Sequence, residues 1–313
     1  MDDRKAYMLN GLLERYFDLS RVIRFRRVQR GLQTESYEVL TPGNYDLLLH
    51  LFPSAFDSDA LNNAIAMMDE VSTAGFPTPR ALAIQSSQNS FIAPGPQGTH
   101  LVLNTAPRGQ PLAVREWTNM DLSHLGLRLA WMHRLMAESK TPAVAASPAG
   151  LLRRAIREPS PRSDSLRRAL KADHLEKLVQ TLEQIVPVVH GFRHGGVAPE
   201  AILLDSGRQV SAVLDWGLFS AGLPQEDVVD FFVQWCIEPD GQVRMPEAQS
   251  FFQAYLSLTA TSEELWRQAV LVWCAHRATT ALAGTGTLPR GFATFLEKPE
   301  FLLAAISVCL SRI

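Results

Sequence analysis

The chain has 313 residues, of which 46% are hydrophobic and 20% are charged, and its formal net charge at pH 7 is -2. This length and composition fit a globular protein with one large or two modest domains. They argue against a nucleic acid or an anionic membrane as partner, because both favour a basic excess, and no apolar run approaches the roughly 18–20 residues that span a bilayer.

The first hundred residues predict a small sheet with helices. A helix is expected through about Phe17, because apolar residues recur on one helical face. Alternating apolar residues between turn residues predict five strands, at 25–29, 36–40, 45–52, 90–93 and 100–105. Between the third and fourth strands, Ser58 or Asp59 can cap a helix that Gly75 and Pro77 end.

Helices dominate the chain after about residue 108. Apolar residues repeat at steps of three and four in 122–136 and 175–185, and 265–283 is apolar on nearly every face, as in a buried helix. The segment 139–165 is rich in Pro, Ser and Ala and is expected to be an exposed connection with at most a short basic helix. This order predicts an α+β protein with a small N-terminal lobe, residues 1–107, and a larger, mainly helical C-terminal lobe, residues 108–313.

The cysteines and the N-terminus bear on the compartment. Cys236, Cys274 and Cys309 form no close pair and lie in apolar segments, so buried reduced thiols are expected. The acidic start of the chain has no apolar core segment behind it and does not resemble a signal peptide. A cytoplasmic location is therefore expected.

The most informative segment lies between residues 194 and 217. A His-Gly-Gly run at 194–196 is followed by Ala-Pro-Glu-Ala at 198–201 and by a short apolar strand. A turn connects this strand to a second one, which leads into Asp215. The turn itself explains Asp205 without a catalytic role.

This segment resembles the active site of aminoglycoside phosphotransferase and choline kinase-type enzymes, and of the similar type II homoserine kinases. In that family a His-Gly-Asp run is followed five residues later by an Asn, and a strand then leads to an Asp that holds magnesium. Further resemblances follow the family's order along nearly the whole chain: the nucleotide-covering hairpin at 31–39, the Gly-x-Pro-x-Pro junction at 74–79, the inter-lobe hinge at 101–112, the Leu-x-x-Leu-His helix at 129–133 and the structural Asp at Asp227. The resemblance implies a bilobal, protein kinase-like fold.

The resemblance also assigns positions to a cofactor and a metal. It implies ATP as the cofactor, with expected contacts at Gly31, Thr34, Ser36, His50 and Asn104. It implies a magnesium ion at Asp215. Judged from its residue type alone, Asp215 could equally be a turn residue at the end of a strand, since one carboxylate is few ligands for magnesium.

Four positions that carry the family's chemistry hold other residues. Gly196 stands in the place of the catalytic Asp, and Ala201 in the place of the Asn. His50, or Leu48 if the alignment is shifted by two residues, stands at the position of the phosphate-binding Lys, which is also altered in type II homoserine kinases. The helix offers Asn-Asn-Ala at 62–64 where a Glu is expected. Phosphoryl transfer depends on charge neutralisation and positioning, so ordinary kinase turnover is not expected.

Two nearby residues could compensate. Glu200, one residue before the missing Asn, could reach a metal from a shifted loop, and His194 could act as a base. Each also has a structural explanation: Glu200 as a solvated turn residue, and His194 as a hydrogen-bonded histidine that orients the loop, as it does in the family.

Two functional hypotheses follow. The first is a pseudokinase that binds a nucleotide, a metabolite or a partner protein in the cleft between its lobes. The second is an active ATP-dependent kinase that phosphorylates a hydroxyl of a small molecule through a site rebuilt from Asp215, Glu200 and His194. The simultaneous loss of four functional groups favours the first.

Overall fold

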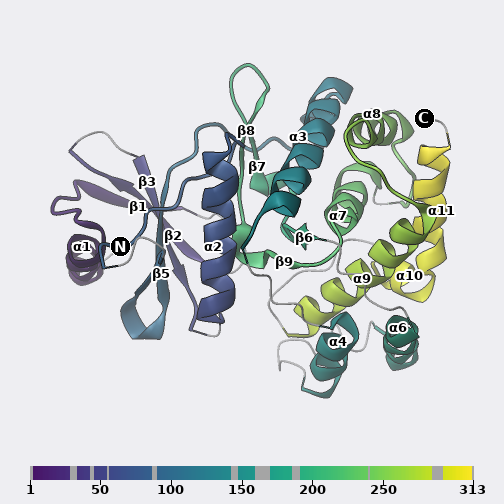
Figure 1. Ribbon diagram of the computed structural model, residues 1–313, viewed down its shortest axis with the longest axis horizontal. Coiled ribbons are helices and arrows are strands. Elements are labelled where there is room, and N and C mark those ends of the chain that lie inside the picture. The colour runs from purple at the N-terminus through teal and green to yellow at the C-terminus, as the bar shows by residue number, and fades with distance from the viewer. Residues whose placement is uncertain are drawn as a thin grey trace. The chain divides into compact units, whose positions relative to one another are not determined.

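The computed structural model describes residues 3–28, 34–42, 46–54, 56–86, 90–141, 147–158, 170–184, 191–238, 240–283 and 292–311 (Figure 1). The chain forms two compact units, each built from three segments. The first comprises Met1–Pro111, Glu138–Ala143 and Glu200–Phe219, and the second comprises Leu112–Ala137, Val144–Pro199 and Ser220–Ile313. The first unit thus includes the segment 200–219, which the sequence analysis assigned to the C-terminal lobe.

An antiparallel sheet is the main element of the first unit, with the strand order β1-β2-β3-β5-β4. The strands are β1 Arg24–Val28, β2 Glu35–Leu40, β3 Asp46–Phe52, β4 Ile92–Pro94 and β5 His100–Thr105. All five overlap the ranges predicted from alternation. The α+β class is therefore confirmed, with the larger sheet in the first unit and most of the described helices in the second.

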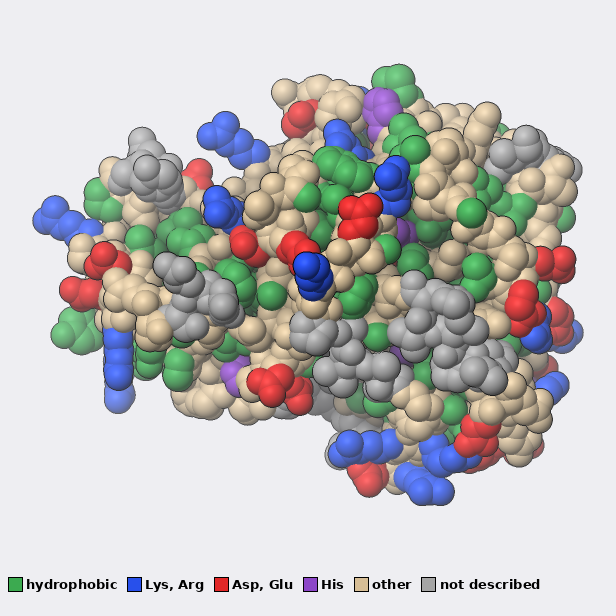
Figure 2. All heavy atoms as spheres, in the orientation of Figure 1, with side chains coloured by type: hydrophobic (Ala, Val, Ile, Leu, Met, Phe, Trp, Pro, Cys, Tyr) green, Lys and Arg blue, Asp and Glu red, His purple; other side chains and the backbone are tan. Residues whose placement is uncertain are grey.

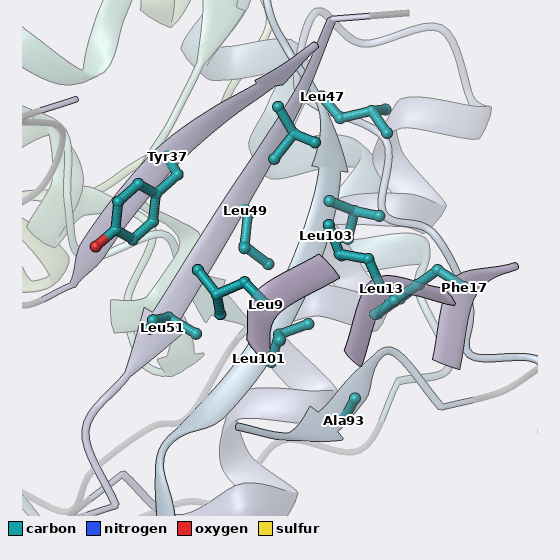
Figure 3. Close-up of a cluster of buried hydrophobic side chains, with 11 residues drawn as sticks. Leu9, Leu13, Phe17, Tyr37, Leu47, Leu49, Leu51, Ala93, Leu101 and Leu103 are labelled. Carbon is teal, nitrogen blue, oxygen red and sulfur yellow. The ribbon is translucent and has the colours of Figure 1, made fainter. Parts of the chain in front are cut away.

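One face of this sheet packs against helix α1, Asp3–Phe17 (Figure 3). Leu9 and Leu13 of α1 have no exposed area, and they lie among buried leucines of β3 and β5. Complete burial of one such side chain stabilises the fold by about 1.5–3 kcal/mol. Tyr37 and Val39 of β2 belong to the same cluster, as expected for residues two apart on one face of a strand.

The other face of the sheet carries polar side chains among buried apolar ones such as Leu48 and Val102. In register, Ser36 pairs with His50, and Leu48 pairs with Asn104. Cross-strand partners share a face, and so do residues two apart along a strand. These four residues therefore lie on the face that α1 does not cover, and three of them are positions predicted to contact a cofactor.

Helix α2, Ser58–Thr73, begins one residue after its cap. The cap is Asp57, whose carboxylate accepts hydrogen bonds from the N–H groups of Asp59 and Ala60. The predicted caps, Ser58 and Asp59, are therefore already inside the helix. The helix ends as predicted before Gly75, whose φ of +89° suits only glycine without strain.

The second unit is mainly helical. Its described helices of eight or more residues are α3 Asn119–Glu138, α4 Pro148–Arg157, α6 Ala172–Gln184, α7 Gln225–Cys236, α8 Met245–Leu256, α9 Glu263–Leu282 and α11 Pro299–Leu310; the shorter α10 spans Phe292–Glu297. Two short strands, β6 Phe192–Arg193 and β9 Ser220–Ala221, pair with each other. The predicted helices at 122–136, 175–185 and 265–283 correspond to α3, α6 and α9.

Helix α4 corrects part of the prediction for residues 139–165. It was expected to be at most a short basic helix in an exposed connection, yet Leu152 is fully buried and α4 packs against α6 and α9. Its cap is Ser147, whose hydroxyl accepts from the N–H of Gly150. The apolar face of this helix is narrow, so the composition of the segment did not indicate a buried helix.

Three further expectations concern the core and the surface. Cys236, Cys274 and Cys309 are free and buried, as predicted. None of the helices in the described part of the chain has the length and apolarity needed to cross a membrane. On the face shown in Figure 2, basic and acidic side chains are interspersed, which agrees with the small net charge.

Candidate functional site

The His-Gly-Gly run forms a loop after β6 in the second unit, and Asp227 of α7 holds its main chain. The carboxylate of Asp227 accepts hydrogen bonds from the N–H of His194 and from that of Gly195, both at 2.7 Å. It also bonds Nε2 of His133 at 3.1 Å, and Nδ1 of His133 lies 3.0 Å from the hydroxyl of Tyr255. The loop is therefore fixed by a buried network that reaches α3 and α8.

The electrostatics of this network keep Asp227 charged. Burial alone would raise its pKa, but the hydrogen bond and the charge of His133, with the N–H of Gly195, outweigh burial and hold the pKa below its usual value. A buried carboxylate that accepts several hydrogen bonds is well satisfied. Asp227 thus acts as an anchor for the loop, the structural role that the resemblance implies.

His194 is fully buried. Its Nδ1 accepts a hydrogen bond from the N–H of Gly196 at 3.1 Å, which places the proton of the neutral ring on Nε2. A ring nitrogen that already accepts a main-chain N–H is occupied in holding the loop. In this tautomer Nε2 already carries the proton, so the proposed role of His194 as a base would require Nδ1 to release the N–H of Gly196.

A second anchor holds the end of the loop. The amide of Gln234, also on α7, donates to the carbonyl of Val197 at 3.0 Å and to the carboxylate of Asp230 at 2.9 Å. Asp230 also accepts from Nε1 of Trp273 at 2.8 Å and from Arg277. Burial raises the pKa of Asp230, although Arg277 opposes this shift. Residues about two turns apart on α7 thus hold successive parts of the loop.

The segment with Asp215 lies in the first unit, after a hairpin of strands β7 Ile202–Leu204 and β8 Val210–Val213. Asp215 has φ +66° and ψ +38°, the left-handed region that few residues other than glycine adopt. The turn that follows, Trp216–Leu218, is a single 3-10 turn. Gly217 lies against the ring of Phe52, where a Cβ would come within 3.0 Å.

Hydrogen bonds fix the residues on both sides of Asp215. The N–H of Leu214 donates to the carbonyl of Ala201 at 2.8 Å. The indole N–H of Trp216 donates to the hydroxyl of Thr78 at 2.7 Å, and that hydroxyl donates to the carbonyl of Val213 at 2.8 Å. The Pro-Thr-Pro junction that the sequence singled out therefore positions the turn at Asp215.

The carboxylates of Asp215 and Glu200 together would favour a bound cation. Desolvation by the surrounding protein and, second, the negative charge of Glu200 raise the pKa of Asp215 to about 6. The side chains of both residues are nevertheless exposed, so water and salt weaken the repulsion between them. A divalent cation would relieve that repulsion and would compete with the proton below about pH 6.

Asp215 and Glu200 fit a weakly held magnesium ion. Carboxylate oxygens are the ligands that magnesium prefers, and the ion keeps several waters and leans on substrate phosphates. Among the described residues, no group of three or more His, Cys, Asp or Glu side chains could hold a metal alone. An ion at Asp215 would therefore depend on a bound phosphate.

The described residues predicted to contact a cofactor lie on the face of the sheet opposite α1, where Ser36 and Asn104 are buried. Thr34 and Ser36 are joined through their hydroxyls at 3.2 Å, and the Ser36 hydroxyl lies 2.9 Å from Nδ1 of His50. An imidazole is positive only when protonated, so His50 supplies no permanent cation of the kind a Lys would. Asn104 is buried on the same face, and Gly31 lies outside the described residues.

Sequence reasoning missed the residues that support these loops. No motif marks Asp230, Gln234 or Tyr255. Their only signal in the sequence was that each is a polar residue within an apolar helix. Asn62, which stands near the expected Glu position, accepts a hydrogen bond from the N–H of Phe91 at 3.2 Å. That bond ties α2 to the segment before β4.

A small antiparallel sheet with one main helix, a mainly helical second part, and an anchored loop followed by a strand-ending Asp define the class of protein kinase-like phosphotransferases. The chain belongs to the phosphotransferase enzyme family, whose model matches residues 24–266. A homoserine kinase of Methylocella silvestris is 22% identical over 258 residues, which are 81% of this chain and 77% of that protein.

Solved structures support the same fold. An amicoumacin kinase in complex with AMP-PNP, Ca2+ and amicoumacin has a TM-score of 0.70 at 11% identity, with 97% of this chain and 94% of that chain covered. An aminoglycoside phosphotransferase, APH(4)-Ia, in a ternary complex with AMP-PNP and hygromycin B has a TM-score of 0.59 at 15% identity, with 96% and 98% covered. The predicted kinase-like fold is therefore confirmed.

Proposed function

We propose that this phosphotransferase-family protein binds a nucleotide together with magnesium, but transfers no phosphoryl group at the rate of a kinase. One observation carries the proposal. The loop at 194–197 keeps its full support from Asp227 and His133, yet the residue at the position of the general base is Gly196. Glycine has no side chain that could accept a proton from a hydroxyl.

The size of the expected loss supports a pseudokinase. A positioned base contributes about 10²–10⁴ to a rate, and a lost electrostatic stabiliser costs about 10²–10³. The losses at Gly196, Ala201 and His50 do not multiply fully, because residues that act as a unit are non-additive. Even one of these losses would abolish most of the turnover of about 1–100 per second that is typical of protein kinases.

Nucleotide is the ligand that the chain's own residues favour. Ser36 and His50 place polar side chains on the face of the sheet opposite α1, and the first unit also carries Asp215 with a neighbouring carboxylate at Glu200. Proteins of similar fold were solved with AMP-PNP. The protein would then respond to the bound nucleotide through a shift between conformations, without converting it.

A second candidate is an active ATP-dependent kinase that phosphorylates a hydroxyl of a small molecule. The observation in its favour is the homoserine kinase among the relatives, together with the retained Asp215. In this case Asp215 and Glu200 would hold the metal, and His194 would be the base once its Nδ1 released the N–H of Gly196.

The test of nucleotide binding is a thermal-unfolding scan with ATP, ADP and GTP, with and without magnesium. A ligand at about 100 times its dissociation constant adds about 2.7 kcal/mol to the free energy of unfolding, which raises the midpoint by several degrees. Asp215→Asn should abolish the magnesium-dependent part of this rise. Asp18→Asn is the matched control, because Asp18 is also exposed and also left-handed, with φ +56°.

Turnover decides between the two candidates. Production of ADP is followed with homoserine and a panel of small alcohols, with wild type and Asp215→Asn side by side. A rate near one per second that disappears in Asp215→Asn would overturn the pseudokinase proposal and support the active kinase. Binding of a nucleotide without turnover is the expected result. Absence of any shift would contradict nucleotide binding and would direct the search to metabolites and partner proteins.

A further inference from the structure

Three basic side chains meet two buried carboxylates of α7 within the second unit. Arg193 of β6 and His276 of α9 approach the same atom, Oε2 of Glu226, with Nε of the arginine at 3.6 Å and Nδ1 of the histidine at 2.7 Å. Arg277, the next residue of α9, pairs with Asp230, one turn further along α7. Since β6 and α9 both pack against α7, the three basic groups form one cluster.

These side chains keep donors that no described protein group uses. Nε of Arg193 donates to the hydroxyl of Ser220 at 2.9 Å, and Nη2 of Arg277 donates to Asp230. A guanidinium has five N–H groups, and the other nitrogens of both arginines, like Nε2 of His276, have no hydrogen-bond partner among the described residues. The side chains of Arg193, His276 and Arg277 are 17%, 13% and 21% exposed. Solvent therefore reaches them only in part, which suits a ligand-binding group better than a surface charge.

Arg193 is held in place beside the anchored loop, which begins at the next residue. Glu226 accepts a hydrogen bond from the N–H of Leu223 at 3.0 Å in addition to its contacts with the basic groups. A Cβ on Gly222 would come within 2.9 Å of Cδ of Arg193 and 2.8 Å of Oε1 of Glu226, so the turn before α7 packs closely on this pair. Donors fixed in advance lower the entropic cost of binding a ligand.

The charge balance of the cluster favours a monoanion. Two guanidiniums face two carboxylates, so the cluster is neutral as long as His276 is neutral. Burial and, second, the charge of Arg193 lower the pKa of His276; Arg277 acts in the same direction, and Glu226 opposes them. Because Nδ1 faces a carboxylate that can only accept, the proton of the neutral ring is on Nδ1 and Nε2 is bare.

An anion next to Nε2 would favour protonation of His276. The cluster would then carry one positive charge, which a single carboxylate balances, whereas a phosphate dianion would leave a negative charge in a largely buried place. The planar carboxylate also matches the planar guanidinium, which can donate two parallel hydrogen bonds to it.

We propose that Arg193, His276 and Arg277 form a subsite in the second unit that binds the carboxylate of a small organic acid beside the loop at 194–197. This ligand would be additional to the nucleotide proposed above, and its binding does not depend on that nucleotide or on any turnover.

NMR of the histidine rings tests the subsite with 4-hydroxybutyrate and with 4-hydroxybutyramide, which has nearly the same shape and no charge. The signal that is missing in His276→Asn identifies His276. In wild type the carboxylate should shift this signal in a saturable manner and raise the pKa of His276, because the anion binds the protonated ring more tightly. The amide should bind about 10- to 100-fold more weakly, the range expected when a charged hydrogen-bond partner is lost.

Arg277→Gln should weaken binding of 4-hydroxybutyrate by a similar factor of about 10- to 100-fold. Arg267→Gln is the matched control, because Arg267 lies on the same helix and pairs with Glu264 at the surface, and it should bind the acid as wild type does. Should Arg277→Gln fail to fold, Arg193→Gln and the comparison of the two ligands on wild type still decide.

Three results would overturn the subsite: no response of His276 to the carboxylate, equal responses to the carboxylate and the amide, or undiminished binding by a folded Arg277→Gln. None of them bears on nucleotide binding, which the thermal-unfolding scan of Asp215→Asn tests separately in the first unit.

Discussion

At the scale of single residues, the two neighbouring glycines of the loop are present for different structural reasons. Gly195 has φ +79°, which side chains rarely adopt, whereas Gly196 is not among the residues with positive φ. Gly195 is therefore required by the backbone. Gly196 is not required by the backbone, so what it contributes there is only the lack of a side chain. The sequence alone could not separate these two cases, because both read simply as glycine.

This difference predicts opposite outcomes for two matched substitutions. Gly195→Ala should lower the free energy of unfolding by about 1–2 kcal/mol, the cost of a left-handed conformation for an L-residue. Gly196→Ala should change it much less, because its backbone conformation is open to any residue. Chemical denaturation of the two variants measures both values. Equal losses would mean that space around the loop, and not the backbone, is the constraint.

At the scale of elements, helix α7 supports the site with polar residues on its buried side. Asp227, Asp230 and Gln234 are spaced by three and four residues, so they lie along one face. This stripe could not be predicted, because a polar residue in an apolar helix normally faces water and only packing shows otherwise. The elements themselves were predictable: alternation predicted the strands of the sheet, recurrence of apolar residues on one helical face predicted α1, α2, α3 and α6, and an apolar run predicted α9.

The second anchor predicts a local effect of Gln234→Leu. Without the amide, the carbonyl of Val197 and the carboxylate of Asp230 each lose a donor. Hydrogen exchange should then become faster in the peptide that covers residues 191–198, with a loss of about 1–3 kcal/mol in stability. Gln253→Leu on the exposed side of α8 is the control. Unchanged exchange in the loop would show that Asp227 alone fixes it.

At the scale of the whole molecule, the order of motifs along the chain was enough to predict the family and the fold. It was not enough to predict how the chain is divided, because the first unit takes in the hairpin β7–β8 from far along the sequence. The main chains of Gln110 and Leu204 are bonded at 3.0 Å in both directions, and Val213 donates to the carbonyl of Pro77 at 2.8 Å. The contact of Val213 with Pro77 crosses the predicted boundary at 107–108, and both contacts tie the hairpin to the first unit.

The division predicts that residues 1–111 do not form a stable unit alone. Such a fragment lacks Val213 and Trp216, which bond the Thr78 hydroxyl and bury their side chains in the intact unit. Its thermal unfolding should be broad and shifted to lower temperature. Addition of a peptide of residues 200–219 should sharpen and raise the transition. A fragment that unfolds cooperatively without the peptide would show that the hairpin is dispensable for this fold.

The anchoring of the loop by Asp227 has an evolutionary consequence. The carboxylate bonds to main-chain N–H groups and to a histidine on another helix, and none of these contacts involves the side chain at position 196. Two of the four Gly codons differ from an Asp codon by a single nucleotide. A lineage can therefore lose an acid at this position, or regain one, in a single mutational step and keep the loop in place. Proteins with Asp and proteins with Gly at this position would share one architecture, so family membership by itself carries little information about activity.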